Sequence, residues 1–310
     1  MAQAKFRVGI TKDNIGPSGQ PLFAVSALTI LRDAGIDYAF LPEYEAELTP
    51  ATAAKYDALA VMLAKVTRHT VSGSDRKLKL IARFGVGYDM VDVAACTENG
   101  VIIAITPDGV RRPVATSELT FILMLAQKVL VKDRLTRAGR WNERANHMGP
   151  GLSGRVLGSI GVGNIGSELF RLTAPLGMKH IACDPYVTQE SVAPLGVTLV
   201  DLDSLFRESD FVCVNCPLNG ETTKLVGARE FSLMKRTAYF INTARGPIVD
   251  IDALYDAMKD GTVLAAGLDV LPQEPANPQS RLIAAWQSNE DWIRHRLVLT
   301  PHSAFYTPES

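Results

Sequence analysis

Arg245, Glu274 and His302 each come shortly after a short apolar run in the second half of this 310-residue sequence. If these runs are parallel strands, their carboxyl ends meet at one edge of a sheet, where ligands of α/β proteins bind. Hydride transfer to a carbonyl needs a proton donor, a partner that keeps the donor oriented and charged, and a cation for the substrate's anion. We expect His302 to be the donor, Glu274 its partner and Arg245 the cation.

Gly161, Gly163 and Gly166 form a G-x-G-x-x-G pattern between an apolar run, 155–160, and a helix-compatible stretch, 167–176. The order of strand, glycine loop and helix is that of a dinucleotide-binding unit. The first glycine permits a tight turn, the second lets the backbone approach a pyrophosphate, and the third lets the helix pack against the strand. The free N–H groups at the start of the helix then bind the anion.

Asp184 ends the next apolar run, 179–183, eighteen residues after Gly166. A carboxylate at this position accepts hydrogen bonds from the adenosine ribose hydroxyls and repels a 2′-phosphate. The following residues, 185–187, supply no arginine or lysine that would bind such a phosphate. The sequence therefore predicts NAD rather than NADP as the cofactor.

A second candidate anion site follows the apolar run 80–83 in the first third of the chain. Gly85 and Gly87 would expose the backbone N–H groups of Val86 and Gly87 as a small anion-binding nest. The structural alternative is a tight turn before a helix.

Short apolar runs separated by helical patterns predict the elements that position these residues. The first set of predicted strands is 6–10, 58–63, 80–83 and 101–105, with helices over 23–34 and 49–55. The second set is 155–160, 179–183, 211–216, 238–242, 265–270 and 297–300. We expect an α/β protein of two doubly wound parallel-sheet domains, in which a Rossmann NAD-binding domain of six strands follows a smaller flavodoxin-like substrate domain. Their predicted limits are 1–107 and 108–302, with 303–310 as a candidate to complete the first.

Two connecting segments have weaker patterns. Residues 114–134 carry an apolar stripe at helical spacing and predict one long helix, with Pro107 and Pro113 punctuating the chain before it. Residues 272–296 hold several prolines and predict a loop with a short helix around 282–286.

The composition excludes several function classes. With 47% hydrophobic and 21% charged residues and a net charge of −1, the chain is neither disordered nor a general binder of nucleic acid or anionic membranes. Cys213 and Cys216 have the spacing of half a zinc site but no second pair, so we expect no metal. The apolar stretch 121–126 is too short to span a bilayer and the N-terminus lacks a signal core, which predicts a reduced, cytoplasmic compartment.

From about Leu78 to Tyr306 the sequence resembles the D-isomer-specific 2-hydroxyacid dehydrogenases, which are NAD-dependent enzymes of two α/β domains. The motifs that carry the resemblance are 83–92, 158–166, 240–250, 266–270 with 273–275, and 300–304. The resemblance implies reversible reduction of a small 2-oxo acid held between the domains, such as glyoxylate or hydroxypyruvate. It also implies a homodimer, with the helix around 118–134 near the interface.

The resemblance assigns roles to further residues. It implies that Asp269 contacts the nicotinamide carboxamide and that Val86 and Gly87 bind the substrate carboxylate together with Arg245. The other residues expected to line the NAD site are Thr116, Asn164, Ile165, Cys216, Pro217, Thr243, Ala244, His302 and Ser303. The substrate-binding segment is expected to comprise Arg83, Phe84, Gly85, Val86 and Gly87.

Two departures from the family pattern and three alternatives accompany this interpretation. Glu274 and His302 are separated by more residues than the family pattern has, which predicts an unusual loop, and relatives continue beyond the position of Ser310 into a helix that crosses back to the substrate domain.

The alternative from another class is an NAD(H)-sensing, corepressor-like binding protein without turnover. Formate dehydrogenase is disfavoured because an amide is expected at position 274. Long phosphoglycerate dehydrogenases are disfavoured because a regulatory domain is absent from the sequence.

Overall fold

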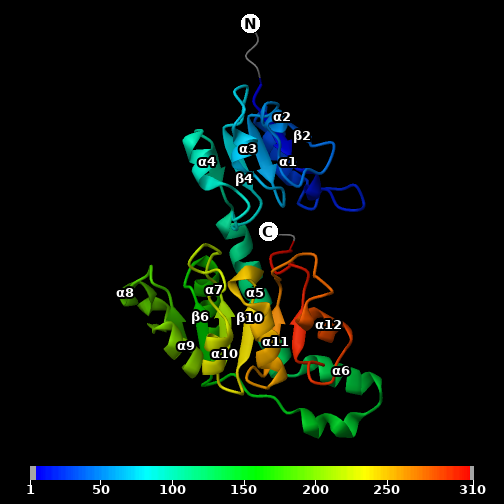
Figure 1. Cartoon of the computed structure of the whole chain (residues 1–310), viewed down its shortest axis with the longest axis vertical. Helices are drawn as coiled ribbons and strands as arrows, with labels where there is room; N and C mark the ends of the chain where they lie inside the picture. Colours follow the sequence, from blue (N-terminus) through cyan, green and yellow to red (C-terminus); the bar gives the residue numbers. More distant parts are fainter. Residues whose placement is uncertain (1–4, 308–310) are drawn as a thin grey trace. The chain divides into compact units, whose positions relative to one another are not determined.

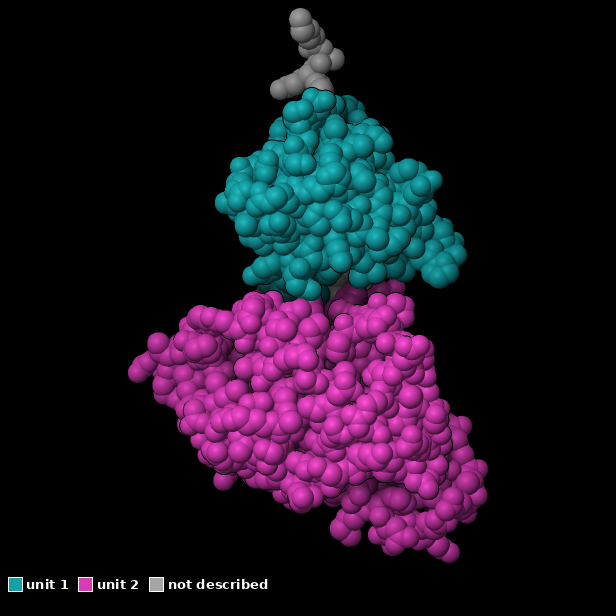
Figure 2. Space-filling model, in the orientation of Figure 1, with its two compact units in different colours: residues 1–110, 307–310 teal, residues 111–306 magenta. Residues whose placement is uncertain are grey.

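The computed structural model describes residues 5–307 and divides into two compact units. Unit 1 comprises residues 1–110 and 307–310, and unit 2 comprises residues 111–306 (Figure 2). The sequence places its domain boundary between residues 107 and 108, and the assignment of substrate to one domain and NAD to the other stays a prediction. Residues 308–310, part of the segment predicted to complete the first domain, lie outside the described residues.

Unit 1 is built on a five-stranded parallel sheet in the order β2-β1-β3-β4-β5. This is the strand order of the flavodoxin-like folds, as predicted. Its strands are β1 (Arg7–Ile10), β2 (Asp37–Phe40), β3 (Ala58–Val61), β4 (Leu80–Arg83) and β5 (Ile102–Ala104). Its helices are α1 (Ser26–Asp33), α2 (Pro50–Ala53), α3 (Arg68–Val71) and α4 (Val93–Glu98). The sequence does not predict β2, because this edge strand is partly exposed and its apolar run, 38–41, is short and begins after the charged Asp37.

Unit 2 contains a seven-stranded parallel sheet in the order β12-β11-β10-β9-β6-β7-β8 (Figure 1). This is the doubly wound order of dinucleotide-binding folds with one strand added at the edge. Its strands are β6 (Val156–Ile160), β7 (Lys179–Cys183), β8 (Val197–Leu199), β9 (Phe211–Val214), β10 (Tyr239–Asn242), β11 (Ala265–Leu268) and β12 (Leu297–Leu299). Six of these strands were predicted, and the short β8 was missed.

The helices of unit 2 are α5 (Pro107–Ala126, in this unit from Arg111 on), α6 (Val129–Arg137), α7 (Asn164–Thr173), α8 (Gln189–Val192), α9 (Leu202–Glu208), α10 (Ala228–Leu233), α11 (Ile251–Lys259) and α12 (Arg281–Gln287). The short helix expected within 272–296 is present as α12.

The prediction of one helix over 114–134 is wrong. The chain forms two helices, α5 and α6, which are bent by 57° at a short break. Lys128 adopts the left-handed backbone region with φ 53°, which ends the helical hydrogen-bond pattern. The end of α5 also lies against another segment, because a Cβ at Gly149 would lie 1.7 Å from the Ala126 carbonyl oxygen. Pro113, expected to punctuate the chain, lies inside α5.

Within residues 5–307 no single helix is long and apolar enough to cross a membrane. The bent pair α5 and α6 passes that test of length and composition only when the two helices are taken together.

The core of unit 2 has two layers, one on each face of the sheet. Alternate residues of β9 point to opposite faces, as the pleat of a strand requires. Val212 and Val214 pack in a cluster with α9 to α12, whereas Phe211 and Cys213 pack in a cluster with α5 and α7. Since β9 is buried on both faces, it reads as an uninterrupted apolar run.

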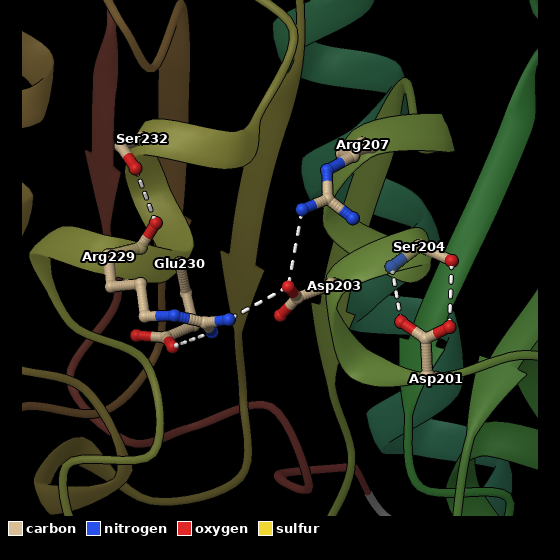
Figure 3. A network of polar contacts seen from close by, with 7 residues as sticks. All are labelled: Asp201, Asp203, Ser204, Arg207, Arg229, Glu230 and Ser232. Atoms are coloured by element: carbon tan, nitrogen blue, oxygen red, sulfur yellow. Dashed lines mark hydrogen bonds and ion pairs between the residues drawn. The ribbon is translucent and has the colours of Figure 1, made fainter.

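An ion-pair network joins the surfaces of α9 and α10 (Figure 3). Asp203 Oδ2 forms ion pairs with Nη2 of Arg229 at 2.8 Å and with Nη2 of Arg207 at 3.2 Å, and both arginine side chains are more than half exposed. Asp201 caps the start of α9 by accepting a hydrogen bond from the N–H of Ser204 at 2.8 Å. This network fastens two neighbouring helices.

Candidate active site

The glycine loop has the backbone geometry that the G-x-G-x-x-G pattern predicts. Gly161 has φ +99°, and a Cβ there would lie 2.9 Å from the carbonyl carbon of Asn215. A Cβ at Gly166 would lie 2.6 Å from the Gly161 carbonyl oxygen, so only glycine lets α7 approach the strand this closely. A Cβ at Gly163 would meet nothing within 4 Å, and Gly163 precedes the first residue of α7. The open space at this helix N-terminus fits the pyrophosphate of a dinucleotide.

Asp184 follows β7 and lies against the glycine loop. Its Oδ2 accepts a hydrogen bond from the N–H of Val162 at 2.8 Å, and its Oδ1 accepts one from the N–H of Tyr186 at 2.9 Å. The carboxylate of Asp184 therefore fixes the conformation of the glycine loop. Its position after β7 is also the one at which the sequence predicts contact with an adenosine ribose.

The structure brings His302 and Glu274 into contact. His302 Nδ1 lies 2.7 Å from Glu274 Oε2, and the other carboxylate oxygen accepts a hydrogen bond from the N–H of Leu271 at 2.9 Å. The side chains of the pair are 35% and 38% exposed, so both can meet a small molecule from solvent. The many residues between the two side chains include α12, and this insertion leaves the pair intact.

Arg245 lies on the loop after β10, which packs closely against the loop that carries Glu274. A Cβ at Gly246 would lie 1.9 Å from the carbonyl carbon of Leu271, so glycine is required where the two loops meet. Burial opposes ionisation of Glu274, but the hydrogen bonds from His302 and Leu271 and the positive charges of His302 and Arg245 outweigh it. The pKa of Glu274 consequently lies below its ordinary value.

Asp269 organises the loop that carries His302. Its buried carboxylate accepts hydrogen bonds from the hydroxyl of Thr300 at 2.5 Å and from the N–H groups of Ser303 at 2.8 Å and Ala304 at 2.9 Å. Its own carbonyl accepts the N–H of His302 at 2.8 Å, and His302 has a positive φ of 52°. The family resemblance implies that Asp269 contacts the cofactor, and its role in fixing the backbone of His302 is visible only in the structure.

Glu118 is a residue that the sequence analysis missed as a site residue. It lies on α5 with no exposed surface, and its Oε1 accepts a hydrogen bond from the hydroxyl of Thr243 at 2.8 Å. Its signal in the sequence is a carboxyl within the apolar stripe of a helix, since Ile122 and Leu125 occur four and seven residues later.

The remaining predicted NAD-site residues lie at four places in unit 2. Asn164 and Ile165 form the first turn of α7, Cys216 and Pro217 follow β9, and Ala244 follows β10. Thr116 is exposed on α5, where its hydroxyl donates to the carbonyl of Arg112 at 2.8 Å. Contact of these residues with NAD stays a prediction.

The predicted substrate residues Arg83, Phe84, Gly85, Val86 and Gly87 lie in unit 1, at the end of β4 and in the bend that follows it. Gly85 has φ +106°, and its N–H donates to the hydroxyl of Thr106 at 2.9 Å. The side chain of Phe84 stacks on Phe23 with ring centroids 5.2 Å apart. Their role toward a substrate stays a prediction.

Over residues 5–307, no group of three or more His, Cys, Asp or Glu side chains is arranged to hold a metal ion. Cys213 and Cys216 are free cysteines. Burial raises the pKa of Cys213 well above its ordinary value and that of Cys216 to about 11, so both are neutral thiols at neutral pH.

The sheet order, the glycine loop and the contact between His302 and Glu274 are features typical of nucleotide-binding α/β domains. The family model "D-isomer specific 2-hydroxyacid dehydrogenase, NAD binding domain" matches residues 119–304. The chain belongs to this family, as the resemblance predicts, and the matched region is an NAD-binding domain.

Two curated relatives of the chain carry different enzyme names. The chain is 38% identical over 258 residues to D-3-phosphoglycerate dehydrogenase of Archaeoglobus fulgidus, covering 83% of this chain and 47% of the relative. It is 35% identical over 257 residues to glyoxylate reductase of Korarchaeum cryptofilum, covering 82% of this chain and 75% of the relative. The chain thus spans about half the length of the first relative and three quarters of the second.

Solved structures of the family have the same fold. The glyoxylate reductase structure from Paecilomyes thermophila matches with a TM-score of 0.82 at 26% identity, covering 99% of this chain and 91% of that one. D-lactate dehydrogenase from Aquifex aeolicus, complexed with NAD and lactic acid, matches with a TM-score of 0.81 at 25% identity, covering 97% and 90%.

Proposed function

We propose that the chain is an NAD-dependent D-2-hydroxyacid dehydrogenase that reversibly reduces a small 2-oxo acid of the glyoxylate or hydroxypyruvate kind. The observation that carries the proposal is the contact of 2.7 Å between His302 and Glu274 at the strand ends that also hold the glycine loop. The names of the relatives support the substrate class, since they include glyoxylate reductases and D-3-phosphoglycerate dehydrogenases.

The glycine loop and α7 would hold the pyrophosphate of NAD, and Asp184 would accept hydrogen bonds from the adenosine ribose. Bound NADH would supply the hydride that the carbonyl carbon of the substrate accepts. Because Asp184 is a carboxylate and no cation follows it in 185–187, NAD is favoured over NADP.

His302 is the acid/base of the proposed reaction. Since Glu274 binds Nδ1, the other ring nitrogen, Nε2, is the atom that donates a proton to the carbonyl oxygen during reduction and takes it back during oxidation. Glu274 keeps the ring oriented. Arg245 would bind the carboxylate of the substrate by two parallel hydrogen bonds.

The proposal includes the homodimer that the family resemblance implies. Sedimentation velocity of the purified chain tests it: a dimer is expected over micromolar concentrations, and a monomer throughout that range contradicts it.

A screen of NADH oxidation over glyoxylate, hydroxypyruvate, pyruvate, phenylpyruvate and branched 2-oxo acids tests the function. We expect steady turnover with at least one small 2-oxo acid. Where the product is chiral, as it is for every panel member except glyoxylate, we expect the D-configuration at C2. Tight NADH binding with no turnover across the panel would overturn the proposal in favour of a nucleotide-sensing protein, an alternative that the relatives do not support.

A further inference from the structure

A row of hydrogen-bonded polar side chains lies between α5 and the sheet of unit 2, next to the loops of the candidate active site. The hydroxyl of Thr243 lies 2.8 Å from Glu118 Oε1, and Asn215 Nδ2 lies 3.4 Å from Glu118 Oε2. Asn215 Nδ2 also donates to Ser159 Oγ at 3.1 Å, and this hydroxyl donates to the carbonyl of Gly161 at 2.7 Å. The row therefore connects the loop after β10 to the glycine loop.

Each member except Glu118 belongs to a strand or to the loop that follows it. Thr243 begins the loop after β10 and precedes Arg245 by two residues, and Asn215 directly follows β9. The backbone of Asn215 also touches the turn at Gly161, where a Cβ would lie 2.9 Å from its carbonyl oxygen. Since Glu118 alone comes from a helix, its carboxyl fastens α5 to two of the loops expected to bind the dinucleotide.

The surroundings of Glu118 favour the neutral acid. The side chain has no exposed surface, and burial raises its pKa to about 8 even though the hydrogen bonds from Thr243 and Asn215 act in the opposite direction. The titratable group that faces it is the thiol of Cys213 on β9, whose own pKa is raised well above its ordinary value chiefly by burial, so this thiol is neutral. From β10 and β6 the facing groups are the hydroxyls of Thr243 and Ser159, which carry no charge.

We propose that Glu118 is a positioning residue that, as a neutral carboxylic acid, holds the loops after β9 and β10 in the geometry that binds the dinucleotide. Among the described residues Glu118 has no ion-pair partner, and an unpaired charge buried between a helix and a sheet is costly. Loss of the proton therefore opens the contact between α5 and the sheet and shifts both loops. The inference rests on the proposed function, because its readout is binding of NADH.

The dissociation constant of NADH, measured by fluorescence titration of the full chain from about pH 6 to about pH 9, tests this proposal. NADH is the probe because its reduced nicotinamide ring carries no positive charge that would attract the ionised Glu118. For the unchanged protein we expect the constant to rise with pH above the ionisation of Glu118, by up to about tenfold per pH unit. Glu118→Gln keeps the shape and cannot ionise: its amide oxygen can accept from Asn215, and its NH2 group can donate to the hydroxyl of Thr243. The variant should therefore bind as tightly at pH 7 and lack the rise.

Glu168→Gln is the matched control. Glu168 is also a buried glutamate, but Arg112 donates a hydrogen bond to it, and this contact together with Arg171 keeps its pKa below the ordinary value despite partial burial. We expect Glu168→Gln to keep the alkaline rise in the NADH dissociation constant, since its carboxyl does not change charge over this pH range.

Three results would overturn the proposal. The first is an equal alkaline rise in Glu118→Gln and the unchanged protein. The second comes from infrared spectroscopy of the unchanged protein with ¹³C-labelled glutamate, which is decisive even if Glu118→Gln does not fold. The band of a protonated carboxyl group should be present at pH 7 and should disappear as the pH rises past the pKa of about 8. Absence of this band at pH 7 contradicts the neutral form. The third is a protein that binds no NADH at any pH, which overturns the proposed function as well, whereas the first two results leave that function standing.

Discussion

Glu274 and Glu118 both lie at the carboxyl ends of the same seven-stranded sheet, but in different surroundings. Glu274 is partly exposed, beside the imidazole of His302 and within the field of Arg245, and its pKa lies below the ordinary value. Glu118 is enclosed between α5 and the sheet, and its pKa is raised to about 8. The exposed region of the edge thus keeps a negative charge, whereas the buried region keeps a neutral acid.

The difference shows that the partner of a carboxyl group, more than its residue type, decides what the group can do. A carboxylate beside an imidazole can hold a positive charge ready for proton transfer. A neutral carboxyl between a helix and a sheet can only donate and accept hydrogen bonds, which suits it to hold loops in place. The following variants test this contrast, from the largest expected effect to the smallest.

His302→Ala removes the proposed proton donor from the exposed region. General acid catalysis contributes about 10²–10⁴-fold, so kcat for the best 2-oxo acid should fall by about that factor. The dissociation constant of NADH should stay nearly unchanged, because the glycine loop is untouched. Steady-state kinetics and fluorescence titration measure the two quantities, and unchanged turnover would contradict the role of His302.

Glu274→Gln keeps a hydrogen-bonding side chain beside His302 but removes the negative charge. A hydrogen bond to a charged group contributes about 1.5–3 kcal/mol, so we expect kcat/KM to fall about 10- to 100-fold. Steady-state kinetics measure kcat/KM, and an unchanged value would count against the pairing.

Asp184→Ala tests the binding part of the same edge. Repulsion of a 2′-phosphate by a nearby carboxylate amounts to about 1 kcal/mol or more, so the preference for NADH over NADPH should fall at least about fivefold. The absolute affinity for NADH should fall too, because Asp184 also holds the N–H of Val162 at 2.8 Å. Dissociation constants of both nucleotides measure this, and an unchanged ratio rules out the proposed discrimination.

Glu118→Gln tests the buried region through stability. The pKa of Glu118 is about 8 in the folded chain against an ordinary value of 4.5, so over this range the folded state keeps a proton that the unfolded state has released. Stability of the unchanged protein should therefore fall as pH rises from about 5 to about 8, at up to about 1.4 kcal/mol per pH unit from this group. The Gln variant lacks this contribution.

The difference in unfolding free energy between the two proteins, measured by urea titration at several pH values, should move in favour of the Gln variant as pH rises. A difference that stays constant would mean that Glu118 is ionised throughout and would remove the contrast with Glu274.

Asp203→Asn provides the smallest expected effect. Asp203 pairs with Arg207 and Arg229 in the network on α9 and α10, where both arginines are more than half exposed and solvent screens the charges (Figure 3). Exposed pairs contribute about 0–1 kcal/mol each, so the unfolding free energy should change by no more than about 1 kcal/mol, with NADH affinity unchanged. A large loss of NADH affinity would mean that surface charges act on the site.

Much of the candidate site could be predicted because the sheet is parallel. Apolar runs such as 211–216 and 238–242 indicate buried strands, and the residues that follow them must lie at one edge. The edge strand β2 and the short β8 were missed, since neither has a long apolar run. The break between α5 and α6 was missed because Gln127 and Lys128 are not helix breakers, and only the left-handed backbone of Lys128 reveals it.

The sequence by itself determined most of the buried strands and the residue types that follow them at the edge of the sheet. These are the glycine pattern, Asp184, and the three residues Arg245, Glu274 and His302. These follow from local rules, because turn conformation and strand ends depend on neighbouring residues. The tertiary structure alone decided which charges those side chains meet. Glu274 lies beside an imidazole and Glu118 lies under a helix because of contacts between residues far apart in the chain. Those contacts decide whether the pKa of each carboxyl group is lowered or raised.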